Sequence, residues 1–230
     1  MIESAFAASN ADFFKKVMDE FSPIGSRVLD TTSGYLRLWD RLEGMQRLEG
    51  GSVYEVVYMD LRPLPKIGVI GSFSHLPFMN GSFNTLIFDP PYTSGGSARV
   101  TGDKKRLTAS GAWTASVTSD ELDRGHRKFE SAVVKLGKGG YGEMRLVLDK
   151  IFLEFYRVLK PAGYVIMKSS DLREGNEVFP FTAYAWSKWK ELLKLEALLY
   201  QVIPASGIKA GNRHVTVTHN TWSVWGHKRI

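Results

Sequence analysis

Residues 84–95 read NTLIFDPPYTSG, and this stretch joins an apolar run to a turn that no sheet can continue. The run from Thr85 to Phe88 predicts a buried strand, and Asp89 follows it directly. Two prolines come next, and a proline donates no hydrogen bond to a β-ladder. The stiff turn either simply closes the strand or holds Asp89 and the ring of Tyr92 at a fixed spacing for chemistry.

Outward from this stretch, predicted strands alternate with predicted helices. Apolar side chains recur at helical spacing from Met144 to Leu159, whereas VYEVVYMDLRP at 53–63 is rich in β-branched and aromatic residues. The predicted strands are 28–30, 53–62, 66–73, 85–88, 164–168, 197–203 and 215–227, and the predicted helices are 4–21, 35–47, 144–159 and 181–195. Helices between strands predict an α/β fold, with a mostly parallel sheet of seven strands covered on both faces.

Polar residues stand at the ends of most of these strands. They are Asp30, Asp60, Ser72 with its neighbour Phe73, Asp89 and the segment Lys168–Asp171. Carboxyl ends of parallel strands meet at one edge of a sheet, and ligands bind beyond that edge. An aspartate at a strand end is, taken singly, usually a turn residue or a helix cap. The joint placement of these residues is what predicts a binding site.

Length and composition indicate one globular domain spanning residues 1–230. Hydrophobic residues make up 43% of the chain and charged residues 23%, and no apolar run approaches membrane-spanning length. The first twenty residues have the pattern of an amphipathic helix rather than a signal peptide. We therefore expect a cytoplasmic protein, a monomer or homodimer, with no membrane partner.

The chain has no cysteine, which excludes disulfides, thiolate metal sites and a cysteine nucleophile. Its five histidines lack ligand spacing with carboxylates, so no metal site is expected. A net charge of +6 permits a polyanionic partner without requiring one.

Several motifs together resemble the class I methyltransferases that use S-adenosylmethionine (SAM) to methylate exocyclic amino groups of nucleic-acid bases. Asp89-Pro90-Pro91-Tyr92 matches the catalytic tetrapeptide of that family. The similarity extends over roughly 26–92 and 143–228. It includes VLDTTSGY (28–35), YMDLRP (58–63), LPFMNGSFNTLIFDPPY (76–92), FYRVLKPAGYVIMK (155–168) and HNTWSVWGHKR (219–229). The resemblance implies a Rossmann-like SAM-dependent methyltransferase fold.

The resemblance also implies a role for each residue of the tetrapeptide. Asp89 accepts one N–H of the target amino group, and the backbone carbonyl of Pro90 accepts the other. Pro90 and Pro91 fix the backbone, and Tyr92 stacks on the base. Two acceptors aim the nitrogen lone pair and disperse its developing positive charge. The base must leave its stack to reach such a pocket.

For the cofactor, the resemblance implies that the turn after the first strand approaches the methionine part of SAM. Asp30 either orders this loop or meets the ammonium group. Asp60 either accepts the ribose hydroxyls or has a structural role, capping backbone N–H groups or pairing with Arg62. The segment Pro77-Phe78 either flanks the adenine or places an aromatic ring in the core. The predicted cofactor-binding residues are Asp30, Thr31, Thr32, Ser33, Gly34, Asp60, Leu61, Ser72, Phe73 and Asp89.

Residues 93–142 interrupt the alternation and form a predicted basic insertion. They contain nine Lys or Arg against five Asp or Glu, a surplus of four in a chain of net charge +6. Basic charge following a catalytic turn favours phosphate binding, although a solvated loop explains the same composition. The predicted nucleic-acid-binding residues are Arg99, Lys104, Lys105, Arg106, Trp113, Arg124, Arg127 and Lys128.

Three functions remain open from the sequence. The first is a DNA amino-methyltransferase, with N6 of adenine favoured over N4 of cytosine, because members of the family with DPPY mostly modify adenine. The second is an RNA base methyltransferase acting on N6 of adenine or N2 of guanine. The third is a non-catalytic, methyltransferase-like nucleic-acid-binding subunit.

Overall fold

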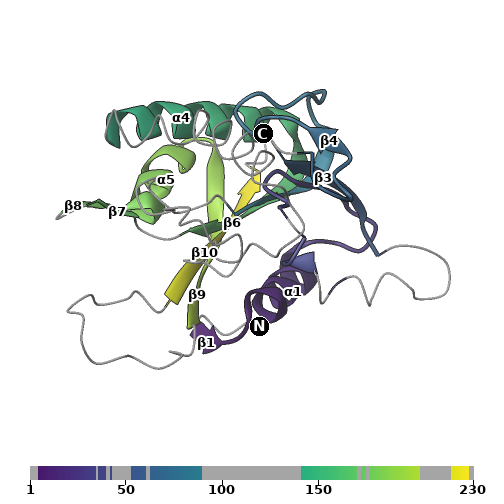
Figure 1. The fold of residues 1–230 in the computed structure, drawn as a ribbon, viewed down its shortest axis with the longest axis horizontal. Helices are drawn as coiled ribbons and strands as arrows, with labels where there is room; N and C mark the ends of the chain where they lie inside the picture. Colours follow the sequence, from purple (N-terminus) through teal and green to yellow (C-terminus); the bar gives the residue numbers. More distant parts are fainter. Residues whose placement is uncertain are drawn as a thin grey trace, which may run out of the picture.

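The structure is a computed structural model, and it describes residues 5–34, 36–39, 42, 53–60, 63–89, 141–169, 172–174, 177–202 and 219–227. Within these ranges one sheet of eight strands runs through the molecule (Figure 1). In spatial order the strands are β1 (Ala5–Ala7), β9 (Leu193–Val202), β10 (His219–His227), β6 (Leu159–Ser169), β5 (Phe83–Phe88), β2 (Arg27–Asp30), β3 (Glu55–Asp60) and β4 (Val69–Ile70).

The sheet is parallel except at β10, which runs antiparallel to both of its neighbours, β6 and β9. The pairs β2–β3, β2–β5, β3–β4 and β5–β6 are all parallel. This confirms the predicted Rossmann-like fold and its mostly parallel sheet of seven strands, to which β1 adds an edge strand beside β9.

Helices cover both faces of the sheet, as Figure 1 shows, with α4 and α5 on one side and α1 on the other. The helices are α1 (Asn10–Phe21), α4 (Tyr141–Val158) and α5 (Phe181–Trp189). Alternate residues of a strand point to opposite faces, so the central strands β2, β5, β6 and β10 supply both layers of the core. Among the described residues, no helix is long and apolar enough to cross a membrane.

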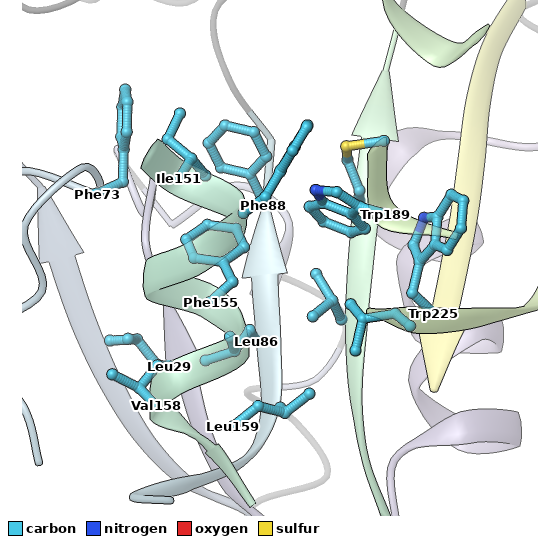
Figure 2. Packing of buried hydrophobic residues seen from close by; sticks show 14 of the residues in the cluster. Leu29, Phe73, Leu86, Phe88, Ile151, Phe155, Val158, Leu159, Trp189 and Trp225 are labelled. Carbon is cyan, nitrogen blue, oxygen red and sulfur yellow. The ribbon is translucent and has the colours of Figure 1, made fainter. Parts of the chain in front are cut away.

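The core layer under α4 and α5 is rich in aromatic rings (Figure 2). Phe88 of β5 meets Phe155 of α4 edge-on, with ring centroids 5.2 Å apart. Trp189 of α5 packs edge-on against Trp225 of β10 at 5.3 Å. These contacts hold both helices on the central strands, and β5 lies at the middle of this layer.

Two predicted elements in the first third of the chain have the wrong bounds. The predicted helix 4–21 begins only at Asn10, where the Ser9 hydroxyl accepts a hydrogen bond from the backbone N–H of Asp12, and Ala5–Ala7 form a strand instead. The strand predicted at 66–73 is reduced to Val69–Ile70. The helix predicted at 35–47 lies mostly outside the described residues.

Two later boundaries also differ from the prediction. Helix α5 ends at Trp189 rather than near 195, because apolar and charged residues alternate from Leu193 onward and this segment joins the sheet as β9. Strand β6 begins at Leu159, but its pairing with β5 shifts between Leu159 and Tyr164. The regular part of β6 is therefore the predicted strand at 164–168. A small hairpin, β7 (Leu172–Glu174) with β8 (Glu177–Phe179), was not predicted.

Candidate functional site

Four charged residues line up at the carboxyl edge of the sheet, in the spatial order Asp60, Asp30, Asp89 and Lys168. Asp60 and Asp30 are the last residues of β3 and β2, Asp89 directly follows β5, and Lys168 is the last residue but one of β6; these four strands are neighbours in that order. In the ladder, Asp30 lies opposite Ile87 and Tyr58, so Asp89 and Asp60 each stand two residues further along their strands. The period of two therefore places all four side chains on the face of the sheet that α1 covers.

The turn that follows β2 is anchored on both neighbouring strands. Thr31 donates from its backbone N–H and its hydroxyl to the Ile87 carbonyl, over 3.0 and 2.8 Å. Ser33 donates from its backbone N–H to the Met59 carbonyl over 3.1 Å, and its hydroxyl accepts from the Met59 N–H at 3.1 Å. The short polar side chains of this turn, rather than glycines, thus fix its path between β3 and β5.

Asp30 orders the same turn through two hydrogen bonds to its carboxylate, and the residue is only 1% exposed. One carboxylate oxygen accepts from the Thr32 N–H at 3.0 Å, and the other accepts from the Trp39 indole N–H at 2.7 Å. Burial raises the pKa of Asp30 from 3.8 to about 7, in spite of the two donors, and repulsion by Asp89 and Asp60 adds to the rise. Asp30 therefore orders the loop, which is one of its two predicted roles, and its contact with the ammonium group of the cofactor stays a prediction.

Asp60 holds the far end of the turn. Its carboxylate accepts a hydrogen bond from the backbone N–H of Gly34 at 3.0 Å. Gly34 has a φ of 52°, in the left-handed region that glycine adopts with less strain than other residues. This conformation lets the chain turn back toward β3. The carboxylate of Asp60 is buried and lies against the loop that is predicted to bind the cofactor.

Asp89 is fixed from two directions. Its backbone N–H donates to the hydroxyl of Thr32 over 2.8 Å, and its carboxylate accepts from the Lys168 ammonium at 3.1 Å. The Asp89 side chain keeps 22% of its surface exposed, whereas that of Lys168 keeps 9%. A partly exposed carboxylate, held on both sides, stands at the end of the central strand.

The loop after β4 contributes polar and aromatic side chains. The Ser72 hydroxyl is 2.9 Å from that of Ser74, and the Ser74 hydroxyl is 3.1 Å from Nδ1 of His75. Phe73 is buried and meets Phe88 edge-on at 5.5 Å, in the core layer shown in Figure 2. The cofactor role of Phe73 stays a prediction, and its ring already packs in the core.

Phe78 packs against the core, and its role beside the adenine stays a prediction. Its ring meets Phe83 edge-on at 4.9 Å. The loop around it is held by Arg157 at the end of α4, which donates to the carbonyls of Leu76 at 3.0 Å and Phe78 at 2.6 Å.

Sequence reasoning assigned no role to two residues of this edge. Lys168 was recognised only as part of a strand end, and its pairing with Asp89 joins positions 79 apart in the sequence. Trp39 fell within a predicted helix, and no local pattern indicates that its indole reaches Asp30. A lysine ending an otherwise apolar strand was the one signal available for Lys168.

The remaining predicted site residues lie outside the described residues. These are Leu61, Pro90, Pro91 and Tyr92, together with Arg99, Lys104, Lys105, Arg106, Trp113, Arg124, Arg127 and Lys128. Of the predicted insertion 93–142, only Tyr141 and Gly142 are described, and they begin α4. Within the described ranges no cluster of His, Asp or Glu has the arrangement of a metal site.

No protein-family model and no curated protein matches the sequence. Among solved structures, TrmN from Thermus thermophilus is similar with a TM-score of 0.50 and 14% identity, over 95% of this chain and 48% of that one. The PH0226 protein from Pyrococcus horikoshii has a TM-score of 0.49 and 16% identity, over 94% of this chain and 89% of that one.

A third similar structure is a SAM-dependent methyltransferase from Methanosarcina mazei, with a TM-score of 0.49 and 12% identity, over 92% of this chain and 96% of that one. At 14% identity the likeness to TrmN concerns the fold alone. The chain has the Rossmann-like α/β fold that its sequence predicts.

Proposed function

We propose that this protein is a SAM-dependent methyltransferase that modifies the exocyclic amino group of a base in DNA, with N6 of adenine as the favoured target. The observation that carries the proposal is Asp89. It is a partly exposed carboxylate at the end of the central strand, hydrogen-bonded through its backbone to the anchored turn that follows β2. The sequence Pro90-Pro91-Tyr92 follows it directly.

The side chains at this edge suit SAM as the methyl donor. SAM carries a net positive charge and two ribose hydroxyls, so it needs acceptors. Asp60 and Asp89 supply carboxylates on either side of the turn. Because both oxygens of Asp30 already bond to Thr32 and Trp39, we assign Asp30 to loop order and Asp60 to the ribose hydroxyls.

Asp89 binds the amino group of the base and accepts its proton. When bound, SAM supplies a methyl group on a positively charged sulfur, which keeps the electron pair of the broken carbon–sulfur bond. An Asp89 oxygen accepts one N–H of the amino group and the Pro90 carbonyl accepts the other, which directs the nitrogen lone pair. The proton that the methylated nitrogen releases passes to Asp89 and then to solvent.

The basic insertion supports nucleic acid as the partner. Its surplus of four positive charges follows the tetrapeptide in the sequence and would attract the phosphate backbone. A base in a duplex must be extruded from the stack to reach Asp89, and Trp113 is the aromatic residue of the insertion that we assign to the vacated stack.

The test is transfer from tritiated SAM to unmethylated duplex DNA and, separately, to total RNA. Asp89→Asn keeps the size of the side chain but replaces one acceptor oxygen with a donor. We expect label on DNA with the wild type and a loss of at least about 100-fold with Asp89→Asn. Nucleoside digestion and mass spectrometry then identify the methylated base.

The matched control is Glu55→Gln, which also replaces a carboxylate with an amide. Glu55 begins β3, at the edge of the sheet opposite to the site, and pairs with exposed Arg27. This variant should transfer label as the wild type does. Label on RNA alone would replace DNA with RNA as the substrate. No transfer to either, with nucleic-acid binding retained, would leave a non-catalytic binding subunit.

A further inference from the structure

Lys168 is an unusual residue for the end of a buried strand. Its side chain is 9% exposed, and an ammonium group loses much hydration free energy when it is buried, so it persists only with a partner. The partner here is Asp89, whose Oδ2 accepts from Nζ at 3.1 Å. The same Nζ lies 5.9 Å from the centre of the Trp222 ring, which adds a cation–π contact.

The pair is built into the sheet itself. Phe88 lies opposite Met167 in the parallel ladder between β5 and β6, so Asp89 and Lys168 form the next step of that ladder and share a face. The two strands that carry the pair, β5 and β6, are buried in the core. A carboxylate fixed by two adjacent central strands is more narrowly oriented than one held by a loop alone.

The ion pair between Lys168 and Asp89 also changes the balance of charge at the carboxyl edge of the sheet. Asp30 and Asp60 lie on the same face of the sheet as Asp89, and repulsion from Asp89 and Asp60 adds to the rise in the pKa of Asp30 that burial causes. Lys168 brings a positive charge to this row on the side of Asp89 away from Asp30. It offsets that repulsion where the proposed chemistry needs an ionised acceptor.

Only one of the two Asp89 oxygens takes part in this contact. Lys168 bonds to Oδ2, and within the described part of the chain no hydrogen bond to Oδ1 is present. We propose that Lys168 is a positioning residue, which holds Oδ2 of Asp89 and thereby turns Oδ1 toward the amino group of the substrate base. The inference rests on the function proposed above, since it assigns Asp89 the role of acceptor.

The experiment compares Lys168→Met, which keeps the length of the side chain without its charge, with Lys168→Arg, which keeps a cationic donor. Tritiated SAM and the same unmethylated duplex DNA serve as substrates. We expect Lys168→Met to lower kcat by about 100-fold, as a misplaced reacting group does, with the KM for SAM within twofold of the wild type. Lys168→Arg should recover most of the lost kcat.

Thermal unfolding and SAM binding of each variant separate positioning from folding. Should Lys168→Met fail to fold, Lys168→Gln replaces it as a neutral variant too short to reach Oδ2. The matched control is Lys194→Met on β9, an exposed lysine paired with Glu196, which should leave kcat unchanged.

A folded Lys168→Met or Lys168→Gln variant with the kcat of the wild type would overturn the inference alone. So would a Lys168→Arg variant that recovers nothing while binding SAM normally. A wild type that transfers no methyl group to DNA or RNA would instead overturn the proposed function, and the role of Lys168 with it.

Discussion

The backbone N–H of Asp89 donates a hydrogen bond to the side-chain hydroxyl of Thr32 over 2.8 Å. Thr32 belongs to the turn that is proposed to hold the cofactor, and Asp89 is the proposed acceptor for the substrate. The contact joins two loops that are 57 residues apart in the sequence, because β2 and β5 are adjacent parallel strands. The position of Asp89 therefore depends directly on that of the turn after β2.

Thr32→Val removes this hydroxyl while keeping the shape of the side chain. We expect kcat for methyl transfer to fall by about tenfold, since the Asp89 N–H loses its acceptor and the turn shifts. Thr32→Ser retains an oxygen at the same place and should stay within about twofold of the wild type. Steady-state transfer from tritiated SAM measures both, and calorimetry gives the affinity for SAM. Equal rates in Thr32→Val and the wild type would contradict the coupling.

The central architecture was accessible from the sequence because it depends on local patterns. The apolar run 85–88, the helical spacing in α4 and the carboxylates at strand ends each indicate an element or an edge without knowledge of the fold. The parallel sheet then follows from the alternation of helices and strands. For the same reason the predicted strand-end residues Asp30, Asp60 and Asp89 do lie on one edge, joined by hydrogen bonds through the turn.

What the sequence did not predict depends on tertiary contacts. Ala5–Ala7 become a strand because β9 offers them a parallel partner, and three residues carry no periodicity of their own. The bonds from Trp39 to Asp30 and from Lys168 to Asp89 join residues whose approach is set by the register of the sheet. Such contacts cannot be inferred from spacing along one strand.

Asp30 should give the protein a measurable dependence of stability on pH. Its folded-state pKa of about 7 exceeds the ordinary value of 3.8, so the folded state binds the proton more tightly than the unfolded state. This contribution to stability is fully present below about pH 4 and is lost as the pH rises to about 7. Its full size is on the order of 4 kcal/mol, as an upper bound.

Urea unfolding of the wild type and of Asp30→Asn between pH 4 and 8 tests this. Asparagine leaves one donor, of Thr32 or Trp39, without an acceptor, and this lowers the stability of the variant by an amount that does not depend on pH. The informative quantity is the difference in unfolding free energy between the two proteins, which should shrink as the pH rises from 4 to 7. A difference that is constant with pH would contradict the raised pKa.

Gly163 should not tolerate a side chain. A Cβ at this position would lie 2.7 Å from the Asn84 carbonyl oxygen and 2.9 Å from Cδ1 of Leu159. Asn84 belongs to β5 and cannot move without disturbing the central ladder, so we expect Gly163→Ala to cost about 1–3 kcal/mol of unfolding free energy. Gly68→Ala, whose Cβ would meet only the Tyr58 carbonyl at 4.0 Å, is the matched control and should be nearly neutral. Similar unfolding midpoints in urea for both variants would refute the close packing.

The basic insertion should determine how binding to nucleic acid depends on salt. Reversing the charges of Lys104, Lys105 and Arg106 removes three cations from a segment whose surplus is four, so the KM for duplex DNA should rise and its salt dependence should weaken. The slope of log affinity against log salt should fall by about 0.9 for each lost phosphate contact. Affinity for SAM should not change, because none of the predicted cofactor-binding residues belongs to the insertion. Reversing Lys15, Lys188 and Lys194, which pair with acids on α1, α4 and β9, changes the net charge equally and is the control. Equal effects of the two charge reversals would mean that overall charge, and not the insertion, attracts the nucleic acid.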